Sequence, residues 1–449
     1  MVEIAKKSAV TIRKRPKGAD YGDILAFLIP CLQFIHLNVI GILNGADLML
    51  LFTFIYLAFR GRLRIASPAA KKFVVFCSLW LVSQIVTDIV RHSVFVDYAR
   101  GWSNIGMTLV NFAVICTLLY GRPKRLLLYA GGVAAGTILT LIIEPDLNML
   151  VEPWKFGISL PVCLLVLIFA SREKSRGYEP VVLCVIVGAV NIAMGTRSAG
   201  AFCLIVASYL LLLRFIYRKG TGVVKLRLSA IVAVIATLVL AISGILWTYG
   251  YLASTGKLGD EARMKYEEQS SGKYGVLVGG RVELLGSIPA IYDSPILGHG
   301  SWARDLKYLI IERQALAMMG YKNAEDYSRV DAESGIIQTH SYFFGAWVSA
   351  GILGAIFWGW VFVLTAKMLL SVYPPTIRLM PLASFAAFTL LWDILFSPYG
   401  ADTRIIAPYY VVLIITCMGI AARRTAGAAP VMAKKRLVTG VAKKRLKTA

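Results

Sequence analysis

The residues best suited to chemistry gather in one polar segment, 248–340, of an otherwise apolar chain. Arg281 follows two glycines in this segment, and His340 ends it, directly before a long apolar run. A guanidinium binds phosphate oxygens through paired hydrogen bonds and stays charged, whereas an imidazole accepts a proton near neutral pH. Arginine and histidine side chains at the boundary of an apolar run therefore indicate an anionic substrate carried by a lipid.

Two further arginines stand next to apolar runs. Arg197 lies in the turn 196–200 between two runs, and Arg404 precedes the last run. We expect Arg281, Arg197 and Arg404 to bind phosphate groups. We expect His340 to act as the general base that removes a hydroxyl proton. The plainer alternatives are a surface contact for Arg281, a topology anchor for Arg197 and a helix cap for His340.

Three residues are secondary candidates. Glu283 is an alternative general base. His299 is a second alternative, although its place between two glycines is more typical of a turn residue. Tyr342 belongs to an aromatic run, which indicates an anchor at the membrane interface more than a platform for a sugar ring.

The pattern within the polar segment predicts two short helices joined by a turn. Apolar residues at helical spacing predict a helix over 281–292, and Asp293-Ser294-Pro295 should end it. Residues 297–300 then predict a tight turn. Similar spacing over 304–319 predicts an amphipathic helix lying on the membrane surface. The polar residues 322–333 predict a loop or lid.

The composition predicts an all-α polytopic membrane protein. Of the 449 residues, 57% are hydrophobic and 16% are charged. A helix needs roughly 20 apolar residues to cross a bilayer. The chain contains about twelve apolar runs: 22–42, 46–59, 73–90, 102–120, 126–143, 158–171, 181–196, 200–217, 228–247, 341–369, 379–396 and 405–422. We therefore expect membrane helices over 1–247, a large loop over 248–340, further membrane helices over 341–422 and a basic tail over 423–449.

The net charge of +23 reflects membrane topology rather than nucleic-acid binding. Basic residues flanking membrane helices collect on the cytoplasmic side. With twelve spans and a cytoplasmic N-terminus, most of the 48 Lys and Arg residues lie in predicted cytoplasmic segments, and Arg91 is one of the few in the short outer loops. This asymmetry places both termini in the cytoplasm and the loop 248–340 outside.

Motifs for other chemistries are missing from the sequence. All seven cysteines lie in predicted spans, so no disulfide framework is indicated in the loop. The chain contains no HExxH, no Walker loop, no G-x-S-x-G and no DxD pair. We therefore predict no metal site and no cofactor.

The loop and its flanks resemble the O-antigen ligase and O-antigen polymerase superfamily of integral-membrane enzymes. The resemblance rests on a large loop before the last three spans and on four short phrases: Gly280-Arg281, Pro295–Gly300, His340 with Tyr342-Phe343 and Gly351–Gly354, and Thr196–Gly200. The family often has asparagine after the histidine, where this chain has Ser341. The phrases cover about thirty residues and are shared by ligases and polymerases.

The resemblance implies a GT-C-like membrane glycosyltransferase in the bacterial inner membrane, with the large loop in the periplasm. The donor would be an oligosaccharide linked to undecaprenyl diphosphate, bound by the three arginines, and His340 would activate the acceptor hydroxyl. Polymerisation of a surface polysaccharide is favoured over ligation to lipid A–core. Direct displacement implies inversion at the anomeric carbon. A chain-length regulator is a further expected partner.

A transporter of lipid-linked sugars is the alternative from another class. Asp88 and Asp393 lie in or near predicted spans, and ionisable residues there are often functional. Both stand near predicted outer ends, where we expect water to solvate them. The two halves show no matching pair of Gly/Pro-broken helices, which transporter repeats often contain.

Overall fold

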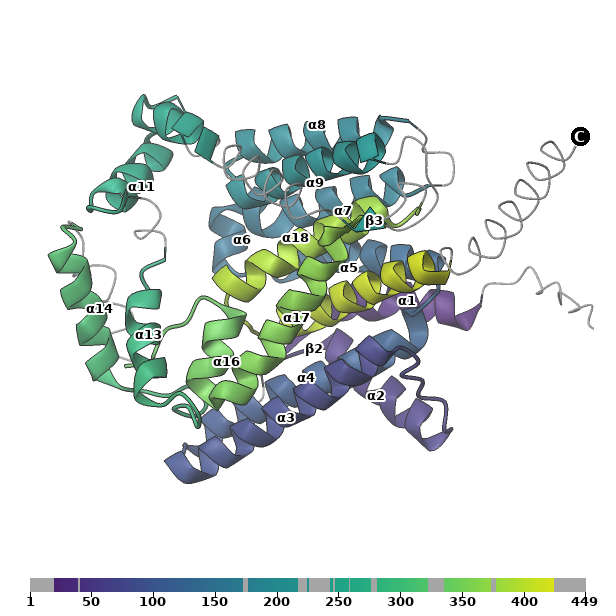
Figure 1. Cartoon of the computed structure of the whole chain (residues 1–449), viewed down its shortest axis with the longest axis horizontal. Helices are drawn as coiled ribbons and strands as arrows, with labels where there is room; N and C mark the ends of the chain where they lie inside the picture. Colours follow the sequence, from purple (N-terminus) through teal and green to yellow (C-terminus); the bar gives the residue numbers. More distant parts are fainter. Residues whose placement is uncertain are drawn as a thin grey trace, which may run out of the picture.

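The computed structural model describes residues 20–38, 41–172, 177–216, 224–225, 243–244, 247–257, 259–275, 281–321, 335–372 and 377–423. Helices dominate it (Figure 1). Two short antiparallel strand pairs accompany them. In the first, β1 (His36–Asn38) pairs with β2 (Ile42–Asn44), and in the second, β3 (Val224–Lys225) pairs with β4 (Ser371–Val372).

Six helices in the described residues are long and apolar enough to cross a membrane. They are α3 (Pro68–Arg91), α4 (Phe95–Leu119), α5 (Pro123–Ile143), α9 (Arg197–Ile216), α17 (Ile352–Leu370) and the C-terminal helix Thr403–Arg423. Shorter apolar helices are α1 (Tyr21–Cys31) with η1 (Leu32–Phe34), α2 (Gly45–Phe59), η2 (Trp154–Ile158) with α7 (Ser159–Ala170), α8 (Glu179–Ala193) and α18 (Met380–Phe396). The short α6 (Leu147–Val151) precedes η2. Most of these helices coincide with the predicted apolar runs. The run 22–42 is helical only as far as Phe34, because the chain then turns into the strands β1 and β2. Most of the run 228–247 lies outside the described residues, and 341–369 is divided as described below.

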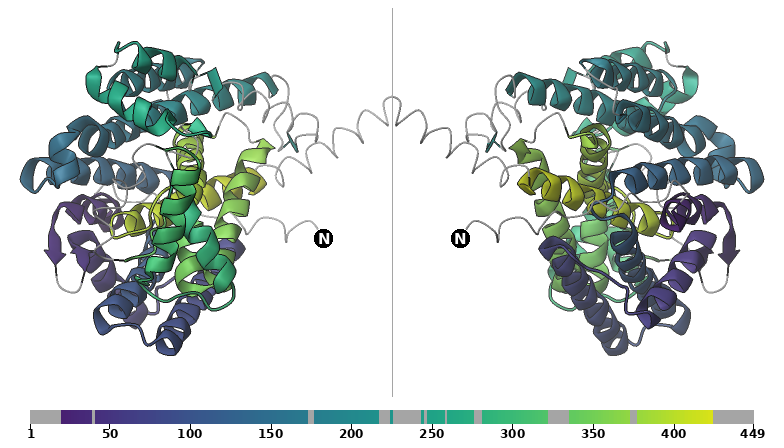
Figure 2. Two further views of the ribbon diagram at one scale, coloured as in Figure 1. Left: turned by 90° about the vertical axis from the view of Figure 1, so that its left-hand side faces the viewer. Right: turned by 90° about the vertical axis from the view of Figure 1, so that its right-hand side faces the viewer.

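The helices form one bundle around a continuous apolar core. Two helix pairs lie at its opposite ends, α3 with α4 at one and α8 with α9 at the other (Figure 2). The helix Thr403–Arg423 is the most buried of the long helices, with 72% of its apolar window covered. Its residues are apolar around the whole circumference, as expected for a helix enclosed by others.

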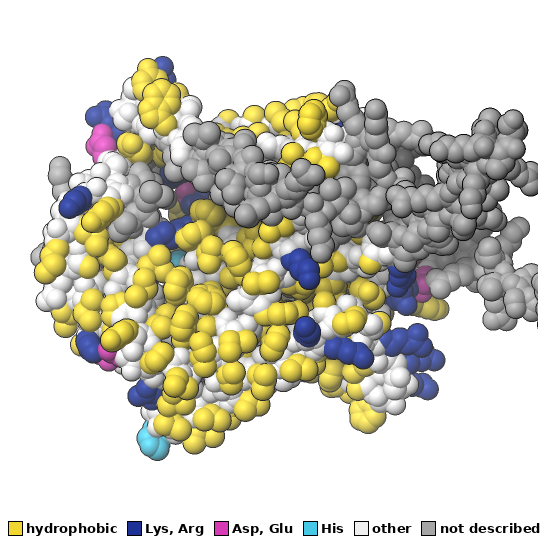
Figure 3. Space-filling view, viewed as in Figure 1, with side chains coloured by type: hydrophobic (Ala, Val, Ile, Leu, Met, Phe, Trp, Pro, Cys, Tyr) yellow, Lys and Arg dark blue, Asp and Glu magenta, His cyan; other side chains and the backbone are white. Residues whose placement is uncertain are grey.

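Hydrophobic side chains also cover the outside of the bundle (Figure 3). On α3, Val75, Val82 and Ile89 are each more than half exposed. A contiguous apolar surface of this kind is unfavourable in water and suits contact with lipid. The fold is therefore compatible with a helical protein embedded in a membrane.

The predicted span 341–369 is wrong in one respect, because the structure divides it in two. Helix α16 (Tyr342–Ala350) ends at Gly351, and α17 begins one residue later. Gly351 has a φ of 68°, and a Cβ there would lie 1.9 Å from the carbonyl oxygen of Ile296. The apolar pattern continues through the break, so hydropathy alone could not reveal it.

The polar segment contains the two short helices predicted for it, in addition to α11 (Asp260–Ser270). Helix α13 (Leu284–Asp293) ends at the predicted stop, and α14 (Leu306–Met318) follows the turn. Asp293 joins them, because Lys307 and Tyr308 donate hydrogen bonds to its carboxylate and thereby lower its pKa. Helix α13 also packs against α16 (Figure 1). The predicted loop 322–333 and Gly279-Gly280 lie outside the described residues.

Candidate functional site

The turn after α13 fits into the break between α16 and α17. The backbone N–H groups of His299 and Gly300 donate to the carbonyl oxygens of Val348 and Ser349 at 2.7 and 3.0 Å. The last carbonyls of a helix lack partners within the helix. The segment Pro295–Gly300 supplies these partners, so the predicted turn positions the polar segment on the bundle.

Side chains from α3 hold the same turn from the other side. Arg91 donates from Nε to the Gly298 carbonyl at 3.0 Å and from Nη2 to Ser294 Oγ at 2.7 Å. Thr87 Oγ1 donates to the Leu297 carbonyl. In the sequence, Arg91 is recognisable only as one of the few basic residues of the short outer loops. Its neighbour in space is a turn about 200 residues later, so no local signal could have indicated this role.

The carboxylate of Asp88 on α3 accepts several hydrogen bonds where the polar segment attaches to the bundle. The Ser301 N–H donates to Asp88 Oδ1 at 2.6 Å, and Ser301 Oγ donates to Oδ2 at 2.7 Å. Ser93 Oγ and Trp102 Nε1 donate to the same carboxylate at 2.7 and 2.8 Å. Only 1% of Asp88 is exposed. The expectation that water solvates it is therefore wrong, because protein donors replace water around the carboxylate.

His340 and Glu283 lie side by side. His340 Nδ1 is 3.1 Å from Glu283 Oε1, and their side chains are 45% and 18% exposed. Backbone hydrogen bonds between 303–305 and 335–337 lead the chain toward His340. Ser341 then caps α16, since its Oγ accepts from the Phe344 N–H at 3.1 Å. The structure thus brings together the predicted base and a secondary candidate, and it leaves Nε2 as the imidazole nitrogen that can face a substrate.

Arg281 stands two residues before Glu283. Its guanidinium lies 5.2 Å from the ring centroids of both Trp392 and Phe396 on α18. Burial lowers the pKa of this half-buried arginine, and the charge of Glu283 raises it. Arginine nonetheless remains charged at any physiological pH. The aromatic rings hold this half-buried cation two residues before Glu283, the carboxylate that contacts His340. A partly desolvated guanidinium can bind an anion strongly.

Arg197 begins α9 and lies 4.0 Å from the ring centroid of Tyr249. Farther along α9, Phe202 contacts Trp392 edge-on at 5.7 Å. Trp392 therefore touches both α9 and Arg281. The first turns of α9 and the Arg281 segment therefore meet at one side chain of α18.

Arg404 has a different environment from the other two arginines. It is 4% exposed, and its Nε donates to Asp47 Oδ2 at 2.9 Å. Nη2 donates to the same carboxylate and to the Ile42 carbonyl. Asn111 completes the cluster by donating to Asp47 Oδ1 at 2.8 Å. The guanidinium thus joins α2 to the C-terminal helix inside the protein, and we do not include it in the candidate site.

The two remaining secondary candidates pack within the protein. His299 Nε2 lies 2.7 Å from the Ala290 carbonyl oxygen, and its ring contacts Tyr308 edge-on. It therefore connects the turn to α13, in agreement with its interpretation as a turn residue. Tyr342 is 2% exposed and contacts Trp358 and Tyr399 in an aromatic cluster.

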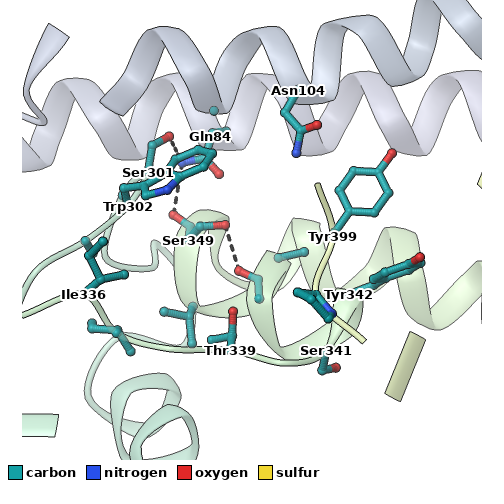
Figure 4. Close-up of a pocket in the computed structure, with 18 of the residues that line it drawn as sticks. Gln84, Asn104, Ser301, Trp302, Ile336, Thr339, Ser341, Tyr342, Ser349 and Tyr399 are labelled. Atoms are coloured by element: carbon teal, nitrogen blue, oxygen red, sulfur yellow. Dashed lines mark hydrogen bonds between the residues drawn. The ribbon is translucent and has the colours of Figure 1, made fainter. Parts of the chain in front are cut away.

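A cavity of about 350 Å³ opens beside His340. Helices α3, α4 and α16 form its walls together with the segments 300–303, 336–341 and 398–399 (Figure 4). His340 is one of the lining residues. Within the described residues, no three His, Cys, Asp or Glu side chains lie close enough together to hold a metal ion.

The fold and the site together define a mostly helical protein with membrane-length apolar helices and a polar segment attached at one helix break. Neither the models of known protein families nor the sequences of curated proteins give a match to this chain.

Proposed function

We propose that this protein is an inner-membrane glycosyltransferase that moves a glycan from undecaprenyl diphosphate to a sugar hydroxyl at the periplasmic face. The observation that carries the proposal is the contact between His340 and Glu283 at 3.1 Å. The half-buried Arg281 stands two residues before Glu283 in the chain. Such a transfer requires a base, a carboxylate that orients the base and a cation that binds phosphate.

Each residue has a defined part in the reaction. Glu283 accepts a hydrogen bond from His340 Nδ1–H, which leaves Nε2 unprotonated and directed to the acceptor hydroxyl. The hydroxyl oxygen forms a bond to the anomeric carbon while its proton passes to Nε2. The bond from that carbon to the diphosphate oxygen breaks, and the diphosphate leaves with the electron pair. Displacement from the opposite side inverts the anomeric configuration.

Arg281 stabilises the departing diphosphate, and Arg197 is the second candidate for this role. The negative charge on the leaving group increases as the bond breaks, so a fixed guanidinium binds the transition state more tightly than the donor. Because the arginines neutralise this charge, the mechanism needs no metal. The resemblance of the Gly280-Arg281 and His340 phrases to the O-antigen superfamily supports the same assignment.

Polymerisation of a surface polysaccharide is the reaction we favour, and ligation to lipid A–core is its close alternative. Both use the same donor and the same base. The transporter alternative loses one of its two candidate carboxylates, because Asp88 is held by the hydrogen bonds that attach the polar segment. A buried carboxylate with this many fixed donors suits a structural role.

Gene deletion in the host, followed by complementation, tests the proposal without knowledge of the sugar. Deletion should abolish the polymerised or ligated surface glycan and cause undecaprenyl-diphosphate-linked oligosaccharide to accumulate. The wild-type gene should reverse both effects, whereas His340→Ala, expressed at the same level, should reverse neither. Full reversal by His340→Ala would show that the imidazole is not the base.

A further inference from the structure

The cavity beside His340 is uncharged, unlike the environment of Arg281. The described residues that line it include no Lys, Arg, Asp or Glu, and His340 is the only histidine among them. The others are aromatic, amide, hydroxyl and aliphatic residues and glycines. An anion buried here would lose its hydration and would meet no lysine or arginine on the wall, which is costly. The cavity therefore suits a neutral polar ligand.

Aromatic rings line the cavity on two sides. Figure 4 shows Trp302 on one side and Tyr399 with Tyr342 on the other. Trp302 has a φ of 48°, which a residue with a side chain rarely adopts. Such a conformation costs about 1–3 kcal/mol and persists where the surroundings enforce it, often at binding sites. Flat apolar faces in this position can stack on the C–H face of a sugar ring.

Two residues that line the cavity each carry a buried polar atom with no hydrogen-bond partner within the described residues. These atoms are Asn104 Oδ1, an acceptor, and Trp80 Nε1, a donor. Trp80 is only 4% exposed. Buried polar atoms nearly always have partners, because an unsatisfied one costs about 1–3 kcal/mol. Hydroxyl groups both donate and accept, so a ligand rich in hydroxyls can satisfy both atoms.

Part of the cavity wall is held in place before any ligand binds. Gln84 Nε2 donates to Ser301 Oγ at 2.9 Å, and Ser301 is held by Asp88. Gly101 permits this close approach, since a Cβ there would lie 2.0 Å from Ser301 Oγ. A preformed wall lowers the entropic cost of binding.

We propose that this cavity binds an uncharged pyranose ring of the acceptor glycan, with Trp302 stacking on the ring and Asn104 and Trp80 binding its hydroxyls. The volume of about 350 Å³ lies at the lower end of the range for small-molecule sites and suits a ligand of one or two rings. Only the role of the ring as acceptor rests on the proposed function. In that role, a hydroxyl at the edge of the ring reaches His340, while the charged donor stays at Arg281.

The test is ligand-observed NMR on the full chain in lipid nanodiscs. Methyl glycosides of glucose, N-acetylglucosamine and rhamnose are the neutral probes, and methyl glucuronide is the charged counterpart. We expect saturation transfer to at least one neutral glycoside and none to the glucuronide. Trp302→Ala should abolish the signal, and Asn104→Leu should weaken binding about tenfold, the worth of a hydrogen bond of roughly 1.4 kcal/mol. The exposed Trp247→Ala is the matched control and should leave binding unchanged.

Two results would overturn the proposal: equal signals from wild type and Trp302→Ala, or equal binding of the glucuronide. A parallel measurement with undecaprenyl diphosphate separates this proposal from the proposed function. Trp302→Ala should retain that lipid, whereas Arg281→Ala should lose it and keep the glycoside. If Arg281→Ala still binds the lipid, Arg281 does not form the donor site. The glycoside measurements then decide the sugar site independently.

Discussion

His340 Nδ1 and Glu283 Oε1 lie 3.1 Å apart, although one residue precedes α13 and the other precedes α16. Packing of α13 against α16 closes this distance. The pair has the arrangement of a base and an orienting carboxylate, in which the carboxylate selects the tautomer and stabilises the imidazolium that forms.

Glu283→Gln should reduce turnover while preserving the fold. The amide keeps the size of the side chain but removes the charge that stabilises the imidazolium, so we expect a loss of about 10²-fold or more in the rate of transfer. The rate is measured with reconstituted protein and extracted lipid-linked donor. Glu267→Gln, an exposed position on α11, is the control. Equal rates in the two variants would exclude Glu283 from catalysis.

Arg281→Ala should weaken binding of undecaprenyl diphosphate by about 10- to 100-fold, the usual worth of hydrogen bonds to a charged group. Arg281→Lys should restore little, because an ammonium cannot form the paired hydrogen bonds of a guanidinium. Binding is measured by native mass spectrometry of the protein in nanodiscs. His340→Ala should bind the lipid normally and lose about 10²–10⁴-fold in turnover. Normal binding by Arg281→Ala would remove it from the donor site.

Asp88→Asn should destabilise the attachment of the polar segment. One carboxylate oxygen becomes an NH₂ group that faces the donors of Ser301 and Trp102. We expect a loss of about 1–3 kcal/mol and a lower Tm in detergent. Asp305→Asn is the control, because that exposed residue caps α14 and asparagine caps equally well. A Tm unchanged from wild type would mean that Asp88 does not hold the segment.

Gly351→Ala should disrupt the junction of α16 and α17. The φ of 68° disfavours any side chain, and the added Cβ would meet the Ile296 carbonyl. We expect a large drop in both Tm and transfer activity. Gly359→Ala lies in the middle of α17, where a Cβ would make only an ordinary contact with Phe343, so it should be neutral or slightly stabilising. Similar behaviour of the two variants would contradict the close packing at Gly351.

The positive-inside pattern of the sequence predicts which side of the membrane each loop faces. A cysteine at Asp326 should react with a membrane-impermeant maleimide added outside the spheroplast, and a cysteine at Lys219 should react only after lysis. The native cysteines in the described residues are buried or half-buried in helices and should contribute little background. Labelling of the Asp326 position only after lysis would reverse the orientation of the chain.

Local patterns in the sequence determine the class of fold and much of the polar segment. Apolar runs identify the membrane-length helices, because length and hydropathy are properties of consecutive residues. Helical spacing and the stop at Asp293-Ser294-Pro295 identify α13 for the same reason. The glycines around His299 identify the turn.

Only the tertiary structure decides which of these elements meet. The break at Gly351 depends on the Ile296 carbonyl, and the burial of Arg404 depends on Asp47, more than 300 residues away. The same holds for the pairing of His340 with Glu283. Hydropathy and turn propensity describe neighbours in the chain, whereas these contacts arise when helices pack. Arg281 and Arg404 are therefore alike in sequence, and only packing sets Arg404 against the buried Asp47 carboxylate and Arg281 against two aromatic rings of α18.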